Sequence, residues 1–95
     1  MIKMKHVRIT SRVQYEVLVL AGYVNKKDLG LCDSEKKQIL ISMKDGKREA
    51  ERTFIHEVFH AIEFEYDLHI PHALIRILEI PIWKILKLNG WIWDI

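Results

Sequence analysis

The sequence predicts a single α+β domain, in which a small antiparallel sheet of three or four strands packs on one long helix and on one or two further helices. Two observations support this fold class. Apolar residues in the first half of the chain are β-branched and partly alternate with polar ones, whereas from residue 47 they recur at helical spacing. A length of 95 residues suits one domain, with a strand region at about 1–46, a helical region at about 47–90 and a tail at 91–95.

The strand region is expected to hold three or four short antiparallel strands. Its alternating apolar positions are Val7, Ile9, Tyr15, Val17, Val19, Ile39, Ile41 and Met43. Turn-forming residues at 25–28 separate the second strand from residues 29–32, and residues 33–36 form a tight connection into a strand at 38–42. Asp45 and Gly46 close the region.

The helical region is expected to contain two helices. A first helix of roughly five turns runs over 47–66, because its apolar residues follow one face. These residues are Ala50, Phe54, Val58, Ala61 and Ile62. Pro71 suits the first turn of a second helix that starts near His72, since the missing N–H needs no partner there. We expect a kink or a restart at Pro81 and a helix end at 88–90.

Composition argues against several classes of function. Fifteen Lys and Arg face thirteen Asp and Glu, which gives a net charge of +2 with the two signs interspersed along the chain. We therefore expect no nucleic-acid binding. Charged residues interrupt the apolar stretch 70–95 too often for a membrane span, and no signal-peptide pattern follows Met1. The single cysteine, Cys32, is expected to be a small buried residue without a disulfide, so the predicted location is cytoplasmic.

The chemistry is predicted on the first helix, where His56-Glu57-Val58-Phe59-His60 forms an HExxH motif. Histidines four residues apart lie on one helix face, so both imidazoles can converge on one zinc ion. Glu57 follows His56 by about 100° of helical rotation, which places its carboxylate beside the metal as a general base for a zinc-bound water. The predicted cofactor is Zn²⁺, and the predicted class is a hydrolase.

A catalytic zinc site normally takes three protein ligands, so the third must come from outside the motif. The candidates are His72, His69 and Glu79. His72 is favoured as the metal ligand, because a helix start behind Pro71 holds its ring more rigidly than a loop would hold His69.

Two acidic residues lie further along the same face of the first helix. Glu63 is roughly 10 Å along the axis from His56, too far for three ligands on one straight helix to meet one ion. We interpret Glu63 and Asp67 as solvated charges, or as groups that contact substrate or orient a metal ligand.

Residues 53–63, the histidine-bearing second helix and residues 29–33 (LGLCD) together resemble the minigluzincins. These are minimal soluble zinc metallopeptidases related to thermolysin-like gluzincins and to CAAX-processing and BlaR-type peptidases. The resemblance implies a zincin-like fold in which the second helix supplies a third zinc ligand, a histidine in the minimal members, which matches His72. Larger relatives have an acidic residue four positions beyond that ligand. This chain has Arg76 there, so Glu79 or Asp67 would have to support the zinc-bound histidine.

The function implied is zinc-dependent endopeptidase activity, with a peptide or protein as the substrate and Glu57 as the general base. Relatives bind the substrate along an exposed sheet edge, and residues 29–32 are our candidate for that edge. Gly30 either leaves room for another backbone or forms an ordinary turn or bulge. An oxyanion partner is also needed. Five residues are candidates for it: Tyr15, Tyr23, Tyr66, His6 and His69.

The tail, residues 91–95 (WIWDI), is too apolar to be left in water and is expected to dock on the domain. Minigluzincins resemble one another in being held latent by C-terminal segments, which implies a zymogen-like form in which Asp94 or the terminal carboxylate occupies the open zinc position. The alternative is that Trp91 and Trp93 complete the core or a dimer contact.

Other interpretations of the whole chain stay open. The apolar series of the second helix is expected to be core, and its extent is also compatible with a homodimer through the C-terminal helical region. Its members are Leu74, Ile77, Leu78, Ile82, Ile85 and Leu88. One alternative function is a non-catalytic zinc-binding structural or interaction module. Another is a metal-free helical dimer in which the histidines are incidental.

Overall fold

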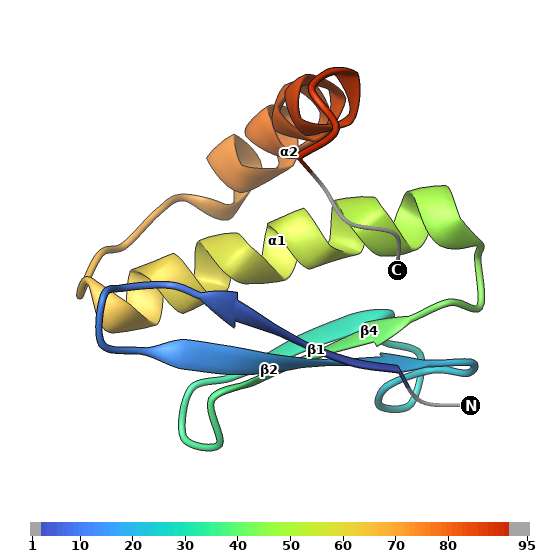
Figure 1. The fold of residues 1–95 in the computed structure, drawn as a ribbon, viewed down its shortest axis with the longest axis horizontal. Coiled ribbons are helices and arrows are strands. Elements are labelled where there is room, and N and C mark those ends of the chain that lie inside the picture. Colours follow the sequence, from blue (N-terminus) through green and yellow to red (C-terminus); the bar gives the residue numbers. More distant parts are fainter. Residues whose placement is uncertain (1–2, 92–95) are drawn as a thin grey trace.

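The computed structural model describes residues 3–91, with side chains from residue 5. The elements, in chain order, are β1 (Lys3–Arg8), β2 (Gln14–Leu20), β3 (Gly30–Asp33), β4 (Gln38–Ser42), α1 (Lys47–Glu65) and α2 (His72–Leu88). Figure 1 shows the sheet, α1 lying across one of its faces, and α2 stacked on α1 away from the sheet. The predicted α+β fold class is confirmed.

The four strands form one mixed sheet in the order β1-β2-β4-β3. β1 pairs antiparallel with β2, and β3 pairs antiparallel with β4, but β2 and β4 run parallel. The prediction of an antiparallel sheet is therefore wrong at the central pair. The physical reason is that β3 and β4 form a hairpin whose more apolar strand, β4, takes the buried central position. The connection at 21–29 carries the chain past that position to the edge, so β4 returns parallel to β2.

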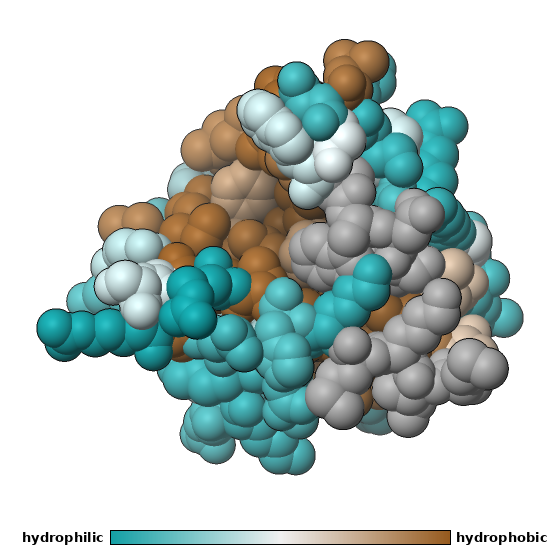
Figure 2. Space-filling model, in the orientation of Figure 1, coloured by the Kyte–Doolittle hydropathy of each residue, from teal (hydrophilic) through white to brown (hydrophobic). Residues whose placement is uncertain are grey.

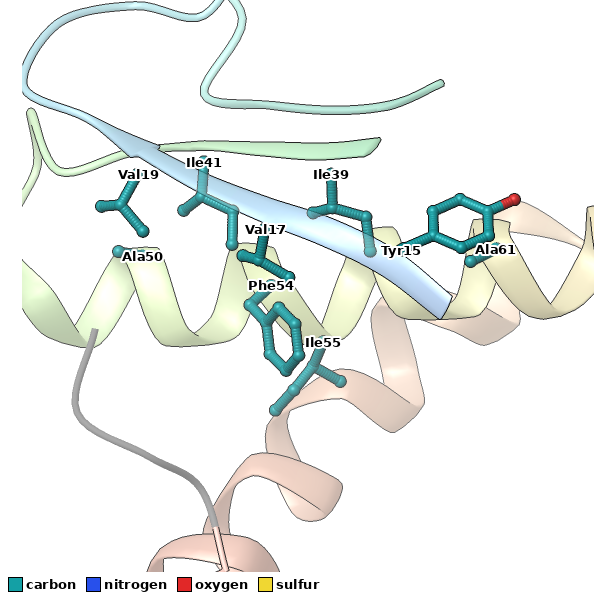
Figure 3. Close-up of a cluster of buried hydrophobic side chains, with 9 residues drawn as sticks. All are labelled: Tyr15, Val17, Val19, Ile39, Ile41, Ala50, Phe54, Ile55 and Ala61. Atoms are coloured by element: carbon teal, nitrogen blue, oxygen red, sulfur yellow. The ribbon is translucent and has the colours of Figure 1, made fainter. Parts of the chain in front are cut away.

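The core lies between the sheet and α1, as Figure 3 shows. The inward residues of the two central strands alternate as predicted and are at most 3% exposed: Tyr15, Val17, Val19, Ile39 and Ile41. They meet four residues of α1 that are at most 5% exposed: Ala50, Phe54, Ile55 and Ala61. This core fixes which face of α1 is turned to the sheet and which is free for chemistry.

Both helices begin and end close to their predicted positions. α1 follows Gly46, whose φ of 95° lies in the left-handed region, and ends at Glu65. α2 begins directly after Pro71, with the Pro71 carbonyl accepting from Leu74 N at 2.9 Å. The helix runs through Pro81, so of the expected kink or restart the restart is wrong. In the described part of the chain, neither helix is long and apolar enough to cross a membrane.

α2 is held against α1 by hydrogen bonds near its end and by a buried side chain near its start. Glu51, only 1% exposed, accepts a hydrogen bond from Nε1 of Trp83 at 3.1 Å and one from Nζ of Lys87 at 3.3 Å. Nearer the start of α2, Ile75 is fully buried. A buried carboxylate is tolerated only when it is paired, so the Glu51 contacts fix the end of α2 over the first turns of α1. The start of α2 then lies over the HExxH turn.

Candidate metal centre

Three imidazoles converge between α1 and α2. Nε2 of His56 lies 3.2 Å from Nε2 of His60 and 3.0 Å from Nε2 of His72. One potential ligand atom from each of the three lies within 4.8 Å of the other two. α1 supplies the first two histidines one turn apart, and α2 supplies the third from its first residue. The three histidines selected from the sequence are therefore brought together, whereas His69 lies outside the group.

Two carboxylates fix the tautomer of the motif histidines. Oε2 of Glu79 lies 2.9 Å from Nδ1 of His56, and Oε1 of Glu63 lies 2.8 Å from Nδ1 of His60. A carboxylate accepts hydrogen bonds, so each Nδ1 carries the proton and donates it. With Nδ1 as the donor, Nε2 of each ring is the atom left to bind a metal. A histidine held in this way by a carboxylate is typical of metal ligands.

The ionisation of these groups fits that assignment. Burial lowers the pKa of His56, although the hydrogen bond and charge of Glu79 partly oppose the shift, which favours the neutral ring that binds metals. The pKa of Glu63 is lowered because Ile70 N–H donates to its Oε2 at 2.9 Å and because His60 donates to its other oxygen. Glu63 is therefore held as a carboxylate that orients His60 and also fastens the loop before α2.

Zinc fits this set of donors. A tetrahedral zinc ion with Zn–N bonds of about 2.0–2.1 Å holds its nitrogen ligands about 3.3 Å apart. The two Nε2 separations that involve His56, 3.2 and 3.0 Å, are close to that value, and the three potential ligand atoms lie within 4.8 Å of one another. Three imidazoles leave a fourth position for water or substrate, and His72 is exposed to solvent on the open side.

Glu57 is not one of the side chains that converge in the histidine cluster. It is 7% exposed, and burial raises its pKa to about 7, with Asp28 and Glu79 adding to the shift and His60 opposing it. A carboxyl group with such a pKa accepts and releases a proton near neutrality. The side chain that the motif marks as general base therefore lies in a suitable environment.

The position of Glu57 also explains why residue 30 is a glycine. A Cβ at Gly30 would lie 2.4 Å from Cγ2 of Thr53 and 2.8 Å from Oε2 of Glu57. The space that Gly30 leaves is filled by α1 side chains, so the expectation that it makes room for an incoming backbone is wrong. Residues 30–32 of the predicted edge do lie in an edge strand, β3, and the binding of substrate along it stays a prediction.

A cleft of about 620 Å³ opens beside the histidines. Its walls come from α1, from the first half of α2 and from the segment that leads into β3: Lys27, Asp28, Leu29, Glu49, Arg52, Thr53, His56, His72, Arg76 and Glu79. The cleft therefore joins the metal centre to the edge strand. None of the five oxyanion candidates is among these residues.

Two of those candidates are committed elsewhere. The hydroxyl of Tyr15 donates to Oε2 of Glu65 at 2.7 Å, and the same carboxylate pairs with Lys37. The hydroxyl of Tyr66 donates to the carbonyl of Ile9 at 3.2 Å. Both phenols therefore have structural roles, and the pKa of Tyr15 is raised by burial and by the hydrogen bond to Glu65.

Two of the remaining candidates, His6 and Tyr23, also lie away from the histidines, and His69 lies in the loop before α2. His6 is on β1, at the opposite edge of the sheet from β3, and the ring of Tyr23 lies 5.1 Å from Nζ of Lys44. Cys32 packs against the core, and burial raises the pKa of its thiol to about 12, in keeping with a structural role.

The two carboxylates that orient the histidines were only partly anticipated. Glu79 was a candidate third ligand or a support for His72, but it contacts Nδ1 of His56. Glu63 was expected to be solvated or to orient a ligand, and its bond to His60 corresponds to the second role. The spacing of three residues between His60 and Glu63 was the available signal, since such pairs are neighbours on a helix.

The predicted docking of the tail lies mostly outside the described residues, because these end at Trp91. Trp91 is 68% exposed and borders an apolar groove of about 320 Å³ between α1, α2 and β1. The other residues of this groove are Val7, Phe54, Ile55, Val58, Phe59, Ile62, Ile82 and Leu86. Brown, apolar side chains gather in this region in Figure 2. The groove shares no residue with the cleft.

The chain has no significant match among protein-family models, curated proteins or solved structures.

Proposed function

We propose that this protein is a zinc-dependent metallopeptidase whose metal is held by His56, His60 and His72. The observation that carries the proposal is the convergence of three Nε2 atoms, with two of the rings held in the metal-binding tautomer by carboxylates. Histidines that bind no common ligand are not expected to direct their ring nitrogens to the same point. A solvent-accessible cleft beside that focus favours a reactive site over a closed structural one.

The chemistry divides between the metal and the chain. When bound, zinc supplies Lewis-acid activation of water and of the scissile carbonyl. Glu57 takes the proton released by the attacking water and passes it to the leaving amine. The cleft receives the peptide, and the adjacent edge strand β3 offers backbone groups along which an extended peptide can pair.

The minigluzincin resemblance belongs to this proposal. Its support is the order of parts along the chain: a small sheet, a motif helix, and a histidine at the start of the next helix. On this proposal the packing of sheet, α1 and α2 is a minimal zincin-like arrangement.

Metal analysis and peptide cleavage together test the proposal. Protein purified without chelators should contain close to one zinc per chain and should cleave peptides in a random mixture, as detected by mass spectrometry. Glu57→Gln keeps the shape of the side chain and removes the base, so zinc content should stay while cleavage falls by roughly 10³-fold or more. Glu35→Gln, on the exposed turn between β3 and β4, is a matched control that should change neither property.

Three outcomes separate the alternatives. Zinc with cleavage that depends on Glu57 supports the peptidase. Stoichiometric zinc without any cleavage would favour the non-catalytic zinc-binding structural or interaction module. Protein that takes up no zinc would remove the metal site and leave the metal-free helical dimer.

Two further expectations accompany the proposal. A cytoplasmic location is supported by the single cysteine, which makes no disulfide. A homodimer through α2 is supported by exposed apolar side chains on that helix: Leu74, Ile77, Ile85 and Leu88. Sedimentation at several protein concentrations tests the dimer, and a monomer at every concentration would contradict it.

A further inference from the structure

The cleft contains cations that the metal site does not use. Arg52 is occupied, because its guanidinium contacts Glu49 at 3.2 Å and Glu79 at 3.9 Å. Arg76 and Lys27 line the same cleft, are exposed, and have no hydrogen-bond or ion-pair partner among the described side chains. Two positive groups are thus available to a ligand in the cleft.

Arg76 lies on the same face of α2 as the third histidine. It follows His72 by four residues, a spacing at which side chains are neighbours with about 5–6 Å between Cβ atoms. Glu79, one turn further, reaches Nδ1 of His56 from that same face. The Arg76 side chain therefore starts between two groups that touch the metal centre, and its guanidinium can reach a ligand bound there.

A bound metal would make the charge balance in the cleft favour an anion. The side chains that line it carry equal numbers of charges of each sign: Lys27, Arg52 and Arg76 against Asp28, Glu49 and Glu79. A divalent metal would add two positive charges, and Lys27 and Arg76 are the cations of the cleft that are not paired with a carboxylate, since Arg52 contacts Glu49 and Glu79. Lys27 comes from the segment that leads into β3, so the two cations approach the cleft from different walls.

We infer that Arg76, assisted by Lys27, binds a carboxylate of the substrate next to the scissile bond. The preferred substrates are then peptides with an acidic side chain, or with a free C-terminal carboxylate, close to the cleavage point. A guanidinium forms two parallel hydrogen bonds with a carboxylate and stays charged at every relevant pH. The term substrate rests on the proposed peptidase function, whereas the carboxylate site can be measured without turnover.

The role assigned to Arg76 is positioning and specificity, so its loss should affect binding more than the chemical step. Arg76→Gln should raise KM for a carboxylate-bearing peptide by about tenfold or more, with a smaller change in kcat. Lys84→Gln removes a cation from the same helix outside the cleft and is the matched control. Zinc content should be unchanged in both variants.

Paired peptides identify the source of the carboxylate. One pair differs by Asp or Asn beside the cleavage point, and a second pair differs by a free or amidated C-terminus. Calorimetric titration of zinc-loaded Glu57→Gln measures their binding without turnover, and Glu57→Gln combined with Arg76→Gln is the comparison. We expect one acidic member to bind about tenfold or more tightly than its neutral partner, and the difference to vanish without Arg76.

The outcomes distinguish this inference from the proposal on which it rests. Cleavage by the wild-type protein with equal affinity for acidic and neutral peptides would overturn the carboxylate site and leave the peptidase intact. A preference in binding that depends on Arg76, in a zinc-loaded protein that cleaves nothing, would overturn the peptidase and leave the carboxylate site. An acidic preference that persists in Arg76→Gln would also overturn the assignment to this residue.

Discussion

Each histidine of the motif has its second ring nitrogen held by a carboxylate. Glu79 reaches His56 from α2, and Glu63 reaches His60 from the next turn of α1. Carboxylates in this position fix the ring orientation and increase the basicity of the nitrogen that faces the metal. His72 has no such carboxylate among the described side chains and has Arg76 as its helical neighbour instead. The two motif histidines are therefore the better prepared ligands.

This asymmetry gives the first prediction. Glu79→Gln and Glu63→Gln should each weaken zinc binding by about 10- to 100-fold, because the amide is neutral and orients the ring less strongly. Competition with a chromogenic chelator measures the affinity. Asp67→Asn is the matched control, since Asp67 makes no contact with the histidines and asparagine tolerates its φ of 51°. An equal loss in Asp67→Asn would indicate general electrostatics rather than orientation of the rings.

The ligands themselves give the second prediction. His56→Ala, His60→Ala and His72→Ala should each weaken zinc binding by more than the roughly 100-fold that an orienting carboxylate contributes, because each removes one of three ligands. His69→Ala should leave the affinity nearly unchanged. If His69→Ala lost zinc and His72→Ala kept it, the third ligand would lie in the loop.

At this scale the sequence was informative where chemistry is encoded by local spacing. His56, Glu57 and His60 follow from helix geometry alone, and His72 follows from a helix start within reach. The partner of Glu79 could not be predicted, because that contact depends on how α2 crosses α1. The crossing is set by buried contacts such as those of Glu51, whose burial has no signal in a charged, helical segment.

Among the elements, the contact of α1 with β3 matters most for the site. Thr53 and Glu57, one turn apart on α1, lie over the backbone of Gly30 with no room for a Cβ. The strand thereby supports the buried side of Glu57. Glycine at this position is required by close approach rather than by a positive φ.

Substitution at Gly30 gives the third prediction. Gly30→Ala should lower the free energy of unfolding by roughly 1–3 kcal/mol, because the new methyl group overpacks the interface. Thr53→Ser removes Cγ2, the atom at 2.4 Å, so the double variant should recover part of the loss. Urea denaturation measures both values. Gly22→Ala, where nothing lies within 4 Å, should change stability by no more than about 0.5 kcal/mol. Equal effects at Gly22 and Gly30 would contradict the packing argument.

The strands show what the sequence could not specify. Alternation in 15–19 and 39–41 predicts which side chains face the core, and this is confirmed. Alternation is the same for parallel and antiparallel neighbours, so it carries no information on the direction of pairing. The order β1-β2-β4-β3 depends on which strand of the β3–β4 hairpin is buried at the centre, a tertiary choice.

For the molecule as a whole, α2 separates two cavities of different character. The first half of α2 borders the cleft beside the histidine cluster, and the second half borders the apolar groove that reaches Trp91. The groove includes Ile55 and Phe59, the sequence neighbours of the two motif histidines. Trp91 therefore lines the same groove as the side of the HExxH turn that faces away from the cleft.

Deletion of residues 92–95 gives the fourth prediction. Four extended residues span at most roughly 14 Å, enough to pass from the groove toward the histidines. We expect the truncated protein to keep its zinc and to cleave peptides several times faster, as the latency implied by the minigluzincin resemblance requires. Retaining Trp91 preserves the wall of the groove and makes the comparison clean. A stable, zinc-loaded truncation with an unchanged rate would contradict latency.

The fifth prediction is that zinc binding stabilises the folded protein against unfolding. The metal centre joins α1 to the first residue of α2, so an ion bound there stabilises the packed arrangement of both helices. At free zinc a thousandfold above the dissociation constant, linkage adds about 4 kcal/mol of stability, which for a domain of this size raises Tm by roughly 15 °C or more. Thermal unfolding with and without a chelator measures the shift in Tm. Hydrogen exchange should show the first turns of α2 opening first when zinc is removed.

Two variants test whether the ion connects the helices. His69→Ala should keep the full shift in Tm. His72→Ala should lose most of it, because the two remaining ligands, His56 and His60, both lie on α1 and no longer bridge α1 and α2. An equal shift in His72→Ala would mean that the ion does not connect the two helices.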